Sequence, residues 1–368
     1  MAMGKFGFIV HPIDARRDAA RKFPWARWLP VPLIEQYLKR TDPMVVGHAQ
    51  GIRSQAGATA EGWFVACPLT PRQMLSLPVE AVLDRIVRAG ELAAEQGAKV
   101  VGLGAYTSVV ADGGITIDQR LPVAVTTGNS YTVATALGGT YKAAEMVGTN
   151  VAEAKAAILG ATGSIGKTCA EALASRVREL TLVGRDLHRL EEARKRIAAM
   201  PSTVASLAVS TDIQASLPEA DLVLTVTSAV HAVIEPAWLK RGAVVCDVAR
   251  PRDVSKRVVE ERDDVLVIEG GVVRIPGQVS FGFRFGFPEG VAYACMAETM
   301  LLALEERYES FTLGKEVTIE QVDEMNRLAR KHGFDLAGFR SFERPVTDEQ
   351  IQHVRERAGR APAVISVA

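Results

Sequence analysis

Short apolar runs alternate with amphipathic segments along most of the chain. The runs are bounded by glycine, proline or small polar residues, which is typical of buried strands, and the segments between them show helical spacing. This alternation predicts an α/β fold with a doubly wound sheet. Strands are predicted at 5–11, 61–68, 99–103, 123–126, 221–227, 243–247 and 265–268. Helices are predicted from Pro71, over 79–97, from about Tyr131, over 290–304, over 317–332 and from near Thr347, with a polar hairpin near 112–114.

The clearest unit is the stretch 155–185, which predicts a strand, a glycine turn, a helix and a second strand. Glycines recur at three-residue spacing between the first strand and the helix. Such a turn points backbone N–H groups and the positive end of the helix dipole at an anion, so a dinucleotide is the expected ligand. The alternative is an ordinary turn of a parallel sheet without cofactor. The predicted cofactor-binding residues are Gly160, Thr162, Gly163, Ser164, Ile165, Gly166, Arg185, Thr227 and Ser228.

The residue at the ribose position indicates which dinucleotide is bound. The second strand of the unit ends in Gly184 and Arg185, followed by Asp186. An arginine at this place favours a 2′-phosphate. We therefore expect NADPH rather than NADH.

The position of the dinucleotide unit predicts three parts. A central Rossmann-type NADP domain is expected over 151–275, flanked by an N-terminal α/β substrate domain over 1–150 and a mainly helical C-terminal part over 276–368. A chain of 368 residues is long enough for more than one core.

Composition excludes several classes of protein. Lys plus Arg equals Asp plus Glu at 43 each, so no overall charge favours nucleic acid or a membrane. The four cysteines have no paired spacing, which argues against a disulfide scaffold or a structural zinc site. The N-terminus lacks the apolar core of a signal peptide, and no apolar run is long enough to be a transmembrane segment. A cytoplasmic protein is expected.

The segment 14–40 departs from this balance because its charges are mostly basic. One interpretation is a solvated helical face with Trp25 and Trp28 packed beneath it. The other is a docking patch for an acidic protein.

Hydroxyl and small residues follow two predicted strands, at 104–108 and 127–130. Such residues form anion or carbonyl sites when they lie near a helix N-terminus, but they also occur in ordinary βα turns. Both interpretations stay open on the residues alone.

Cys295 is expected in the first turns of the helix 290–304. A helix N-terminus lowers a thiol's pKa, and the thiolate is the competent nucleophile. The alternative is a buried structural cysteine. Cys67 at a strand end is the rival nucleophile, whereas Cys169 and Cys246 are expected in the core.

Two further segments have a distinct pattern. The stretch 276–290 has four phenylalanines, at 281, 283, 285 and 287, interleaved with glycine, which indicates a strand or lid with one apolar edge.

His332 lies between Lys331 and Gly333 at a predicted helix end. Basic residues followed by glycine are typical of a C-cap, so a structural role is favoured over a catalytic one.

No YxxxK follows the glycine turn, so the acid/base pair of short-chain dehydrogenases is absent from this sequence. A set of short motifs lies in order along the chain, at 64–67, 103–108, 126–129, 160–166, 269–271, 294–298 and 331–334. This ordered set resembles the cyanobacterial long-chain acyl-acyl-carrier-protein reductases, the aldehyde-forming enzymes of the alkane pathway. The first 60 residues match that family poorly.

The resemblance implies NADPH-dependent reduction of a long-chain fatty acyl thioester to a fatty aldehyde, with an acyl intermediate on Cys295 and an acyl tunnel between the N- and C-terminal parts. It implies acyl carrier protein or coenzyme A as the thioester carrier, and an aldehyde-processing oxygenase as a partner. Members of that family respond to Mg²⁺, but the sequence shows no carboxylate cluster that would hold it. No metal ligand is predicted.

The remaining catalytic candidates follow from the proposed chemistry. The oxyanion of the reacting thioester needs donors, and Thr127, Asn129 and Ser108 are the candidates. Glu298 lies one turn after Cys295 and is expected either to transfer a proton or to pair structurally. Two alternatives stay open: an oxidoreductase similar to shikimate dehydrogenases or glutamyl-tRNA reductases, and a non-catalytic NADPH-binding partner protein.

Overall fold

The computed structural model describes residues 3–283 and 286–360, apart from the side chain of Lys22. It consists of two compact units, one of residues 1–131 and 273–337, the other of residues 132–272 and 338–368. Each unit is described by itself. The predicted boundaries at 150 and 275 concern functional parts and stay a prediction. Phe285 and the tail 361–368 lie outside the described residues.

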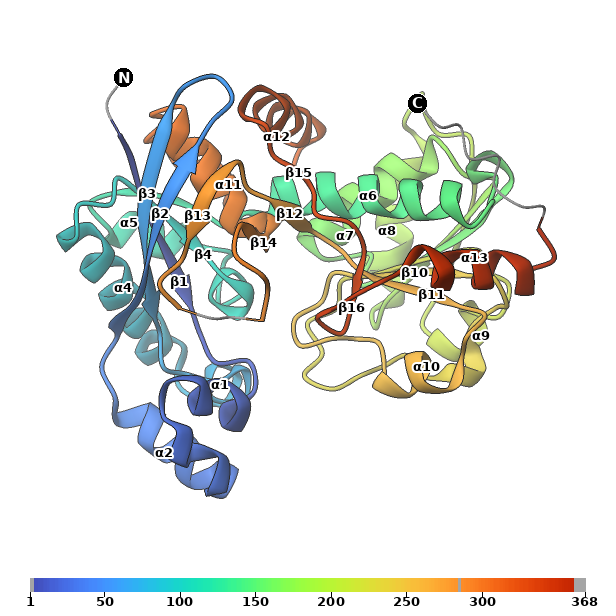
Figure 1. Cartoon of the computed structure of the whole chain (residues 1–368). Helices are drawn as coiled ribbons and strands as arrows, with labels where there is room; N and C mark the ends of the chain where they lie inside the picture. The colour runs from blue at the N-terminus through green and yellow to red at the C-terminus, as the bar shows by residue number, and fades with distance from the viewer. Residues whose placement is uncertain (1–2, 284–285, 361–368) are drawn as a thin grey trace. The chain divides into compact units, whose positions relative to one another are not determined.

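The first unit is built on a mixed six-stranded sheet, in the order β13-β2-β3-β1-β4-β5 (Figure 1). The pairs β3-β1, β1-β4 and β4-β5 are parallel, whereas β2 runs antiparallel to β3 and to β13. The sheet confirms the predicted N-terminal α/β part. Its strands are β1 (Gly4–Val10), β2 (Met44–Arg53), β3 (Thr59–Ala66), β4 (Val100–Leu103), β5 (Ala124–Thr126) and β13 (Gly277–Ser280).

The polar hairpin expected near 112–114 is wrong. The strands β4 and β5 are parallel, and parallel neighbours need a crossover connection. The turn at 112–114 leads into the helix α5 (Ile115–Arg120), whose N-cap Gly114 has φ +91°. The glycines therefore start a helix instead of reversing a strand.

Helices cover both faces of this sheet. A Cβ on Gly7 would lie 2.6 Å from the Cβ of Ala93 in α4 (Val79–Glu95), whereas a Cβ on Gly4 would lie 2.1 Å from the carbonyl oxygen of Ala303 in α11 (Ala294–Leu304). Positions 4 and 7 point to opposite faces, because side chains alternate along a strand. The sheet thus lies between α4 and α11, and glycine lets α11 approach its backbone closely.

The helix expected over 290–304 begins at Ala294 instead. Gly290 has φ +73°, and Val291–Tyr293 form β14, which lies beside β12 (Val272–Arg274) in a small three-stranded sheet. The residues after the glycine turn therefore complete a sheet before the helix starts. Cys295 is consequently the second residue of α11.

The second unit contains a six-stranded sheet in the order β11-β10-β9-β6-β7-β8, with every pair parallel (Figure 1). Counted from β6, this is the strand order of a dinucleotide-binding Rossmann domain. The predicted doubly wound fold is confirmed. Its strands are β6 (Lys155–Leu159), β7 (Glu179–Val183), β8 (Ser206–Ser210), β9 (Leu222–Thr225), β10 (Val244–Asp247) and β11 (Leu266–Glu269). Its helices include α7 (Ser164–Ala174), α8 (Leu187–Ala198), α9 (Ile213–Ser216) and α10 (Lys256–Glu261).

The last third of the chain is mainly helical, as predicted. The remaining elements are α1 (Ala15–Lys22), η1 (Pro24–Trp28), α2 (Val31–Arg40), α3 (Pro71–Ser76), η2 (Ala105–Ser108), α6 (Asn129–Met146), η3 (Val151–Glu153), η4 (Pro236–Trp238), α12 (Ile319–His332), β15 (Asp335–Leu336), β16 (Arg340–Ser341), β17 (Arg344–Pro345) and α13 (Asp348–Arg357). Gly333 caps α12 with φ +82°, as the basic residues followed by glycine predict. His332 is buried and bonded to Ser54 and Glu305, which confirms a structural role.

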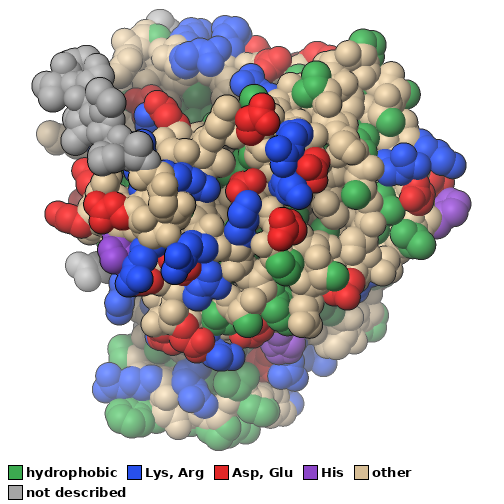
Figure 2. Space-filling view, turned by 90° about the vertical axis from the view of Figure 1, so that its right-hand side faces the viewer, with side chains coloured by type: hydrophobic (Ala, Val, Ile, Leu, Met, Phe, Trp, Pro, Cys, Tyr) green, Lys and Arg blue, Asp and Glu red, His purple; other side chains and the backbone are tan. Residues whose placement is uncertain are grey.

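Surface charge follows the balanced composition. Figure 2 shows one face on which basic and acidic side chains are interspersed. Within the described part of the chain, no helix combines the length and apolar character needed to cross a bilayer.

Candidate functional site

The glycine turn of the second unit can be built only with glycine at two of its positions. Gly160 has φ +82°, and a Cβ on Gly166 would lie 2.2 Å from the carbonyl oxygen of Gly160. Gly163 is the N-cap of α7, and its N–H donates to the Gly160 carbonyl at 2.9 Å. Backbone and small residues therefore surround the N-terminus of α7. This arrangement lets a pyrophosphate approach the backbone N–H groups.

This turn lies beside the end of β9, where the order of strands reverses. A Cβ on Gly160 would lie 2.9 Å from the carbonyl oxygen of Val226, directly after β9. Open α/β sheets bind ligands at this reversal. Thr162, Ser164 and Ile165, three of the predicted cofactor residues, are half-buried around the turn.

Thr227, one of the predicted cofactor residues, is engaged in the protein itself. Its N–H and Oγ1 donate to the carboxylate of Asp253 at 2.9 Å and 2.6 Å, and Thr225 Oγ1 donates to the same group. Asp253 is fully buried, so it fixes the loop after β9. Ser228 follows on this fixed loop.

Two exposed arginines lie near the expected ribose position. Arg185 follows β7, and Arg189 Nη2 donates to the Thr162 carbonyl of the glycine turn at 3.4 Å. Asp186 caps α8 by accepting the Arg189 N–H at 3.2 Å, which places Arg189 one turn into the helix. Arg189 was not among the predicted cofactor residues, although the N-cap spacing from Asp186 could have indicated it.

In the first unit, the turn after β5 lies directly against Cys295. A Cβ on Gly128, which has φ +75°, would lie 2.3 Å from Cys295 Cα and 2.4 Å from Cys295 Cβ. Any residue other than glycine would therefore displace one of the two segments. Residues 127–130 and Cys295 belong to separate candidate features in the sequence, and the structure brings them together through Gly128.

Cys295 differs in burial from the other three cysteines. It is partly exposed, whereas Cys67, Cys169 and Cys246 are buried. Burial raises the pKa of Cys67 to about 12 and that of Cys246 to about 12, and it raises the pKa of Cys169 as well. Cys169 and Cys246 belong to the core as predicted, and Cys67 is poorly suited to form a thiolate.

Glu298, one turn after Cys295, is fully buried and holds three segments together. One carboxylate oxygen accepts hydrogen bonds from Thr126 Oγ1 at 2.5 Å and Thr312 Oγ1 at 2.8 Å, and the other accepts the Tyr131 N–H at 2.8 Å. Burial raises the pKa of Glu298, and these hydrogen bonds oppose part of that shift. Both carboxylate oxygens of Glu298 thus accept hydrogen bonds, one helical turn after Cys295.

The three predicted oxyanion donors differ in burial and in their place along the chain. Thr127 is buried, and its N–H and Oγ1 both donate to the Thr312 carbonyl, at 2.9 Å and 3.0 Å. Ser108 follows β4 and donates its Oγ to the Ala105 carbonyl at 2.7 Å. Asn129 is half-buried and directly follows Gly128 as the first residue of α6. Asn129 is therefore the candidate that lies next in sequence to Gly128, the residue that contacts Cys295.

His11, at the carboxyl end of β1, was not selected from the sequence. Its Nε2 accepts the Tyr106 N–H at 3.0 Å. Desolvation of the imidazole lowers the pKa of His11 to about 4, so the ring is neutral at neutral pH. A histidine as the last residue of a predicted strand was the available signal.

No group of three or more His, Cys, Asp or Glu side chains among residues 3–283 and 286–360 is placed to hold a metal ion.

Comparisons with known proteins agree with this geometry in the second unit. The model of the shikimate / quinate 5-dehydrogenase family matches residues 142–269. These residues include the glycine turn and the six parallel strands. The match and the strand order together indicate a nicotinamide-dinucleotide domain of the kind that NAD(P)-dependent oxidoreductases contain.

Two curated relatives extend over most of the chain. The long-chain acyl-[acyl-carrier-protein] reductase of Synechococcus elongatus is 26% identical over 349 residues, covering 89% of this chain and 98% of that protein. Aminotransferase PigE of a Serratia species is 32% identical over 372 residues, covering 95% of this chain. The chain spans only 42% of the length of PigE. The resemblance to the acyl-carrier-protein reductases thus holds as a distant relationship.

Among solved structures, quinate dehydrogenase from Corynebacterium glutamicum in complex with NAD is 13% identical, with a TM-score of 0.34, covering 72% of this chain and 87% of that one. A likeness of this extent carries no conclusion about fold or activity.

Proposed function

We propose that the protein reduces a long-chain fatty acyl thioester to a fatty aldehyde, with NADPH as reductant and Cys295 as nucleophile. The contact between Gly128 and Cys295 is the observation that carries this proposal. It brings a strand-end turn against the one cysteine that is not buried. The distant relationship to a long-chain acyl-[acyl-carrier-protein] reductase supports the choice of substrate.

The first step is a thioester exchange. The Cys295 thiolate attacks the acyl carbonyl, the carbon–sulfur bond to the carrier breaks, and the carrier leaves as a thiolate that takes up a proton. The acyl group then remains on Cys295 as a second thioester. Covalent capture of this kind divides one difficult substitution into two easier ones.

The second step expels the aldehyde. NADPH held at the glycine turn would supply the hydride that the carbonyl carbon takes up, and collapse of the resulting oxyanion would release aldehyde and regenerate the Cys295 thiolate. Asn129 is our first candidate for a donor to that oxyanion, with Ser108 second. Thr127 is third, because its N–H and hydroxyl already donate to the Thr312 carbonyl. Loss of a single oxyanion donor typically costs about 100-fold or more in rate.

Glu298 acts in this proposal by positioning. Its two oxygens accept hydrogen bonds from Thr126, Thr312 and Tyr131, which fixes the turn after β5 against the first turn of α11. A carboxylate whose oxygens are occupied in this way is better suited to hold the backbone than to exchange protons with a substrate.

The cofactor assignment to NADPH rests on the two arginines near the glycine turn. Arg185 and Arg189 are exposed, and a 2′-phosphate would find a guanidinium partner there. Either acyl carrier protein or coenzyme A could deliver the thioester. An aldehyde-processing oxygenase is the proposed partner for the product.

Intact-protein mass tests the proposal directly. The native protein is mixed with palmitoyl thioester in the absence of NADPH, next to Cys295→Ala and the matched control Cys67→Ala. We expect one acyl adduct on the native protein and on Cys67→Ala but none on Cys295→Ala. Addition of NADPH should discharge the adduct as aldehyde. An adduct that depends on Cys67, or no adduct at any chain length, would contradict the proposal.

The match to the shikimate / quinate 5-dehydrogenase model supports a second candidate, an oxidoreductase acting on another substrate. Turnover of a soluble keto acid that survives Cys295→Ala would favour it. Tight NADPH binding without turnover of any such substrate would favour a non-catalytic binding protein.

A further inference from the structure

The N-terminal segment 14–40 forms a small helical module with its own core. Alanines of α1 and η1 pack against two larger residues of α2, and this core comprises Ala15, Ala19, Ala26, Ile34 and Leu38. The tryptophans do not contribute to this core. Trp28 is 77% exposed and Trp25 is 51% exposed, so the interpretation in which both pack beneath the basic face is wrong.

The apolar side chains outside this core form an exposed surface. Leu33 is 52% exposed and Tyr37 is 46% exposed. The ring of Trp25 contacts the ring of Tyr37 edge-on, with centroids 6.1 Å apart. Arg27 lies over the Trp28 ring at 5.0 Å. Two large aromatic rings are thus presented to solvent beside a guanidinium group.

The charges of the module are unbalanced. The segment 14–40 holds seven Lys and Arg against three Asp and Glu, whereas the whole chain has a formal net charge of zero. The acidic side chains are used internally. Asp14 caps α1, Asp18 accepts two backbone N–H groups and pairs with Arg17 and Arg21, and Glu35 accepts the hydroxyl of Thr70. The net field of the module therefore comes from its basic residues.

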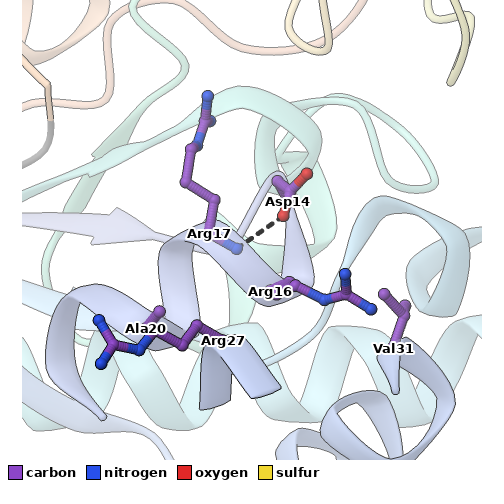
Figure 3. A pocket seen from close by; sticks show the side chains of 6 residues that line it. All are labelled: Asp14, Arg16, Arg17, Ala20, Arg27 and Val31. Atoms are coloured by element: carbon purple, nitrogen blue, oxygen red, sulfur yellow. Dashed lines mark hydrogen bonds between the residues drawn. The ribbon is translucent and has the colours of Figure 1, made fainter. Parts of the chain in front are cut away.

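Three of these arginines line a hollow of about 440 Å³ between α1, η1 and α2 (Figure 3). Its lining consists of Asp14, Arg16, Arg17, Ala20, Arg27 and Val31. The Asp14 carboxylate accepts the Arg17 N–H at 2.7 Å, so this acidic group is already engaged. Within the described part of the chain, neither Arg16 nor Arg27 forms an ion pair with an acidic side chain. The hollow is consequently cationic and open to an external anion.

We propose that this module is the docking surface for an acidic protein that presents the acyl thioester on a phosphate-linked arm. Trp, Tyr and Arg are the residues that most often carry binding energy at protein interfaces. Positive potential on one partner and negative potential on the other accelerate and orient the encounter. A small phosphate ester needs the arginines but leaves the exposed Trp25, Trp28, Leu33 and Tyr37 without a function, which favours a protein. The inference rests on the proposed function.

The test compares two carriers of the same acyl group. Steady-state reduction of palmitoyl-acyl carrier protein and palmitoyl-coenzyme A is measured for the native protein and for Arg16→Glu/Arg27→Glu. We expect KM for the protein carrier to rise by about tenfold or more, with kcat and both constants for the coenzyme A ester unchanged. Addition of about 0.5 M salt should remove most of the difference, because it screens surface charges.

Matched variants separate docking from folding. Lys99→Glu also replaces a basic side chain by an acidic one, at an exposed position before β4. It should leave KM for both carriers unchanged. Trp28→Ala removes an exposed ring and should also raise KM for the protein carrier alone. The thermal midpoint of each variant should stay near that of the native protein. Should the double charge reversal unfold the module, Arg16→Gln/Arg27→Gln takes its place.

Several results would overturn the proposal. An equal rise in KM for both carriers would mean that the hollow takes the phosphate group they share. Unchanged KM values would mean that the surface docks neither carrier. If the native protein reduces no thioester, the proposed function fails, and docking is then judged by calorimetric titration with acyl carrier protein alone. Binding that the charge reversal abolishes would still support the surface, and absent binding would reject it.

Discussion

A single hydrogen atom at Gly128 occupies the place where any other residue would carry a Cβ, 2.3 Å from Cys295 Cα. Gly128→Ala should therefore displace the turn or the start of α11. We expect a loss of about 1–3 kcal/mol in the free energy of unfolding, and acylation of Cys295 slowed by about 100-fold. Chemical denaturation and the rate of adduct formation measure the two effects.

Gly57→Ala is the matched control for this change. Gly57 also has a positive φ, +89°, but a Cβ there would meet nothing within 4 Å. Gly57→Ala therefore measures what alanine in a left-handed backbone conformation costs in the free energy of unfolding, without a steric clash. Equal effects of the two substitutions on acylation would contradict the role given to Gly128.

His11 gives the stability a pH dependence. The pKa of His11 is about 4 in the folded protein against 6.5 for the ordinary group. The unfolded chain thus binds this proton first, and the free energy of unfolding should fall as pH decreases from 6.5 towards 4, by at most about 1.4 kcal/mol per pH unit. His11→Gln keeps an acceptor for Tyr106 but does not titrate, so its decrease should be shallower. Identical slopes in urea denaturation would exclude His11 as a cause.

Sequence alone predicted part of the site at this scale. Cys295 and Glu298 are one helical turn apart, so their shared face follows from spacing. The approach of Gly128 to Cys295 could not be predicted, because it depends on tertiary packing between segments distant in sequence. The same holds for the Thr312 carbonyl, which occupies both donors of Thr127.

Glu298 is informative at the scale of elements, since it connects β5, α6 and the segment around Thr312 to α11. Glu298→Gln can keep an oxygen for the Tyr131 N–H, and the two threonine hydroxyls can reverse their donor direction. We expect Gln to retain acylation within about threefold and Ala to lose about 100-fold. A Gln variant as inactive as Ala, with an altered pH profile, would instead indicate proton transfer.

The β7-α8 connection should determine cofactor preference. Replacement of Arg185 and Arg189 by alanine removes both guanidinium groups beside the glycine turn. The ratio of kcat/KM for NADPH over NADH should fall by about tenfold or more. Lys195→Ala, an exposed position further along the same helix, should leave the ratio unchanged. An unchanged ratio in the double variant would remove the basis for NADPH.

Secondary structure was predicted correctly where the hydrophobic periodicity agreed with the positions of the glycine, proline and small polar residues that bound each element. The βαβ unit at 155–185 and the strands β9, β10 and β11 were predicted within about two residues. The strands β2 and β8 were not predicted. The prediction failed at 112–114 and at 290–293, where glycine turns lead into elements that the local pattern does not distinguish. A turn that starts a helix and a turn that reverses a strand both use glycine with positive φ. Pairing of Val291–Tyr293 beside β12 is likewise a tertiary event.

At the scale of the whole molecule, a buried ionic cluster fixes the last part of the chain to the second unit. Glu269 accepts Arg252 Nη2 at 2.7 Å and the Glu343 N–H at 2.9 Å, and Arg250 Nη2 lies 3.6 Å from its other oxygen. Burial alone would raise the pKa of Glu269, but the two guanidinium groups outweigh it and hold the pKa below its ordinary value. The contribution of ionised Glu269 to the free energy of unfolding is therefore present at neutral pH and is lost as pH falls below about 4.5, the ordinary pKa of the group.

Glu269→Gln should cost about 3 kcal/mol in the free energy of unfolding, because it removes the buried carboxylate that faces both guanidinium groups and leaves Arg252 only its 3.5 Å pair with Glu343. Glu260→Gln breaks an exposed pair with Lys256 within one helix and should cost less than about 0.5 kcal/mol. Denaturation at neutral pH compares the two. Similar small costs would mean that the cluster adds no stability.

The division of the chain has a consequence for biosynthesis. The first unit takes its residues from both 1–131 and 273–337, so its sheet lacks the edge strand β13 and the covering helix α11 until residues 277–304 have been synthesised. The strands of the parallel sheet end at residue 269 and are synthesised before then. During this interval α11 does not yet cover the face of β1 and β4, and the nascent first unit exposes apolar surface of the kind that chaperones bind. Cys295 joins the first unit only together with α11.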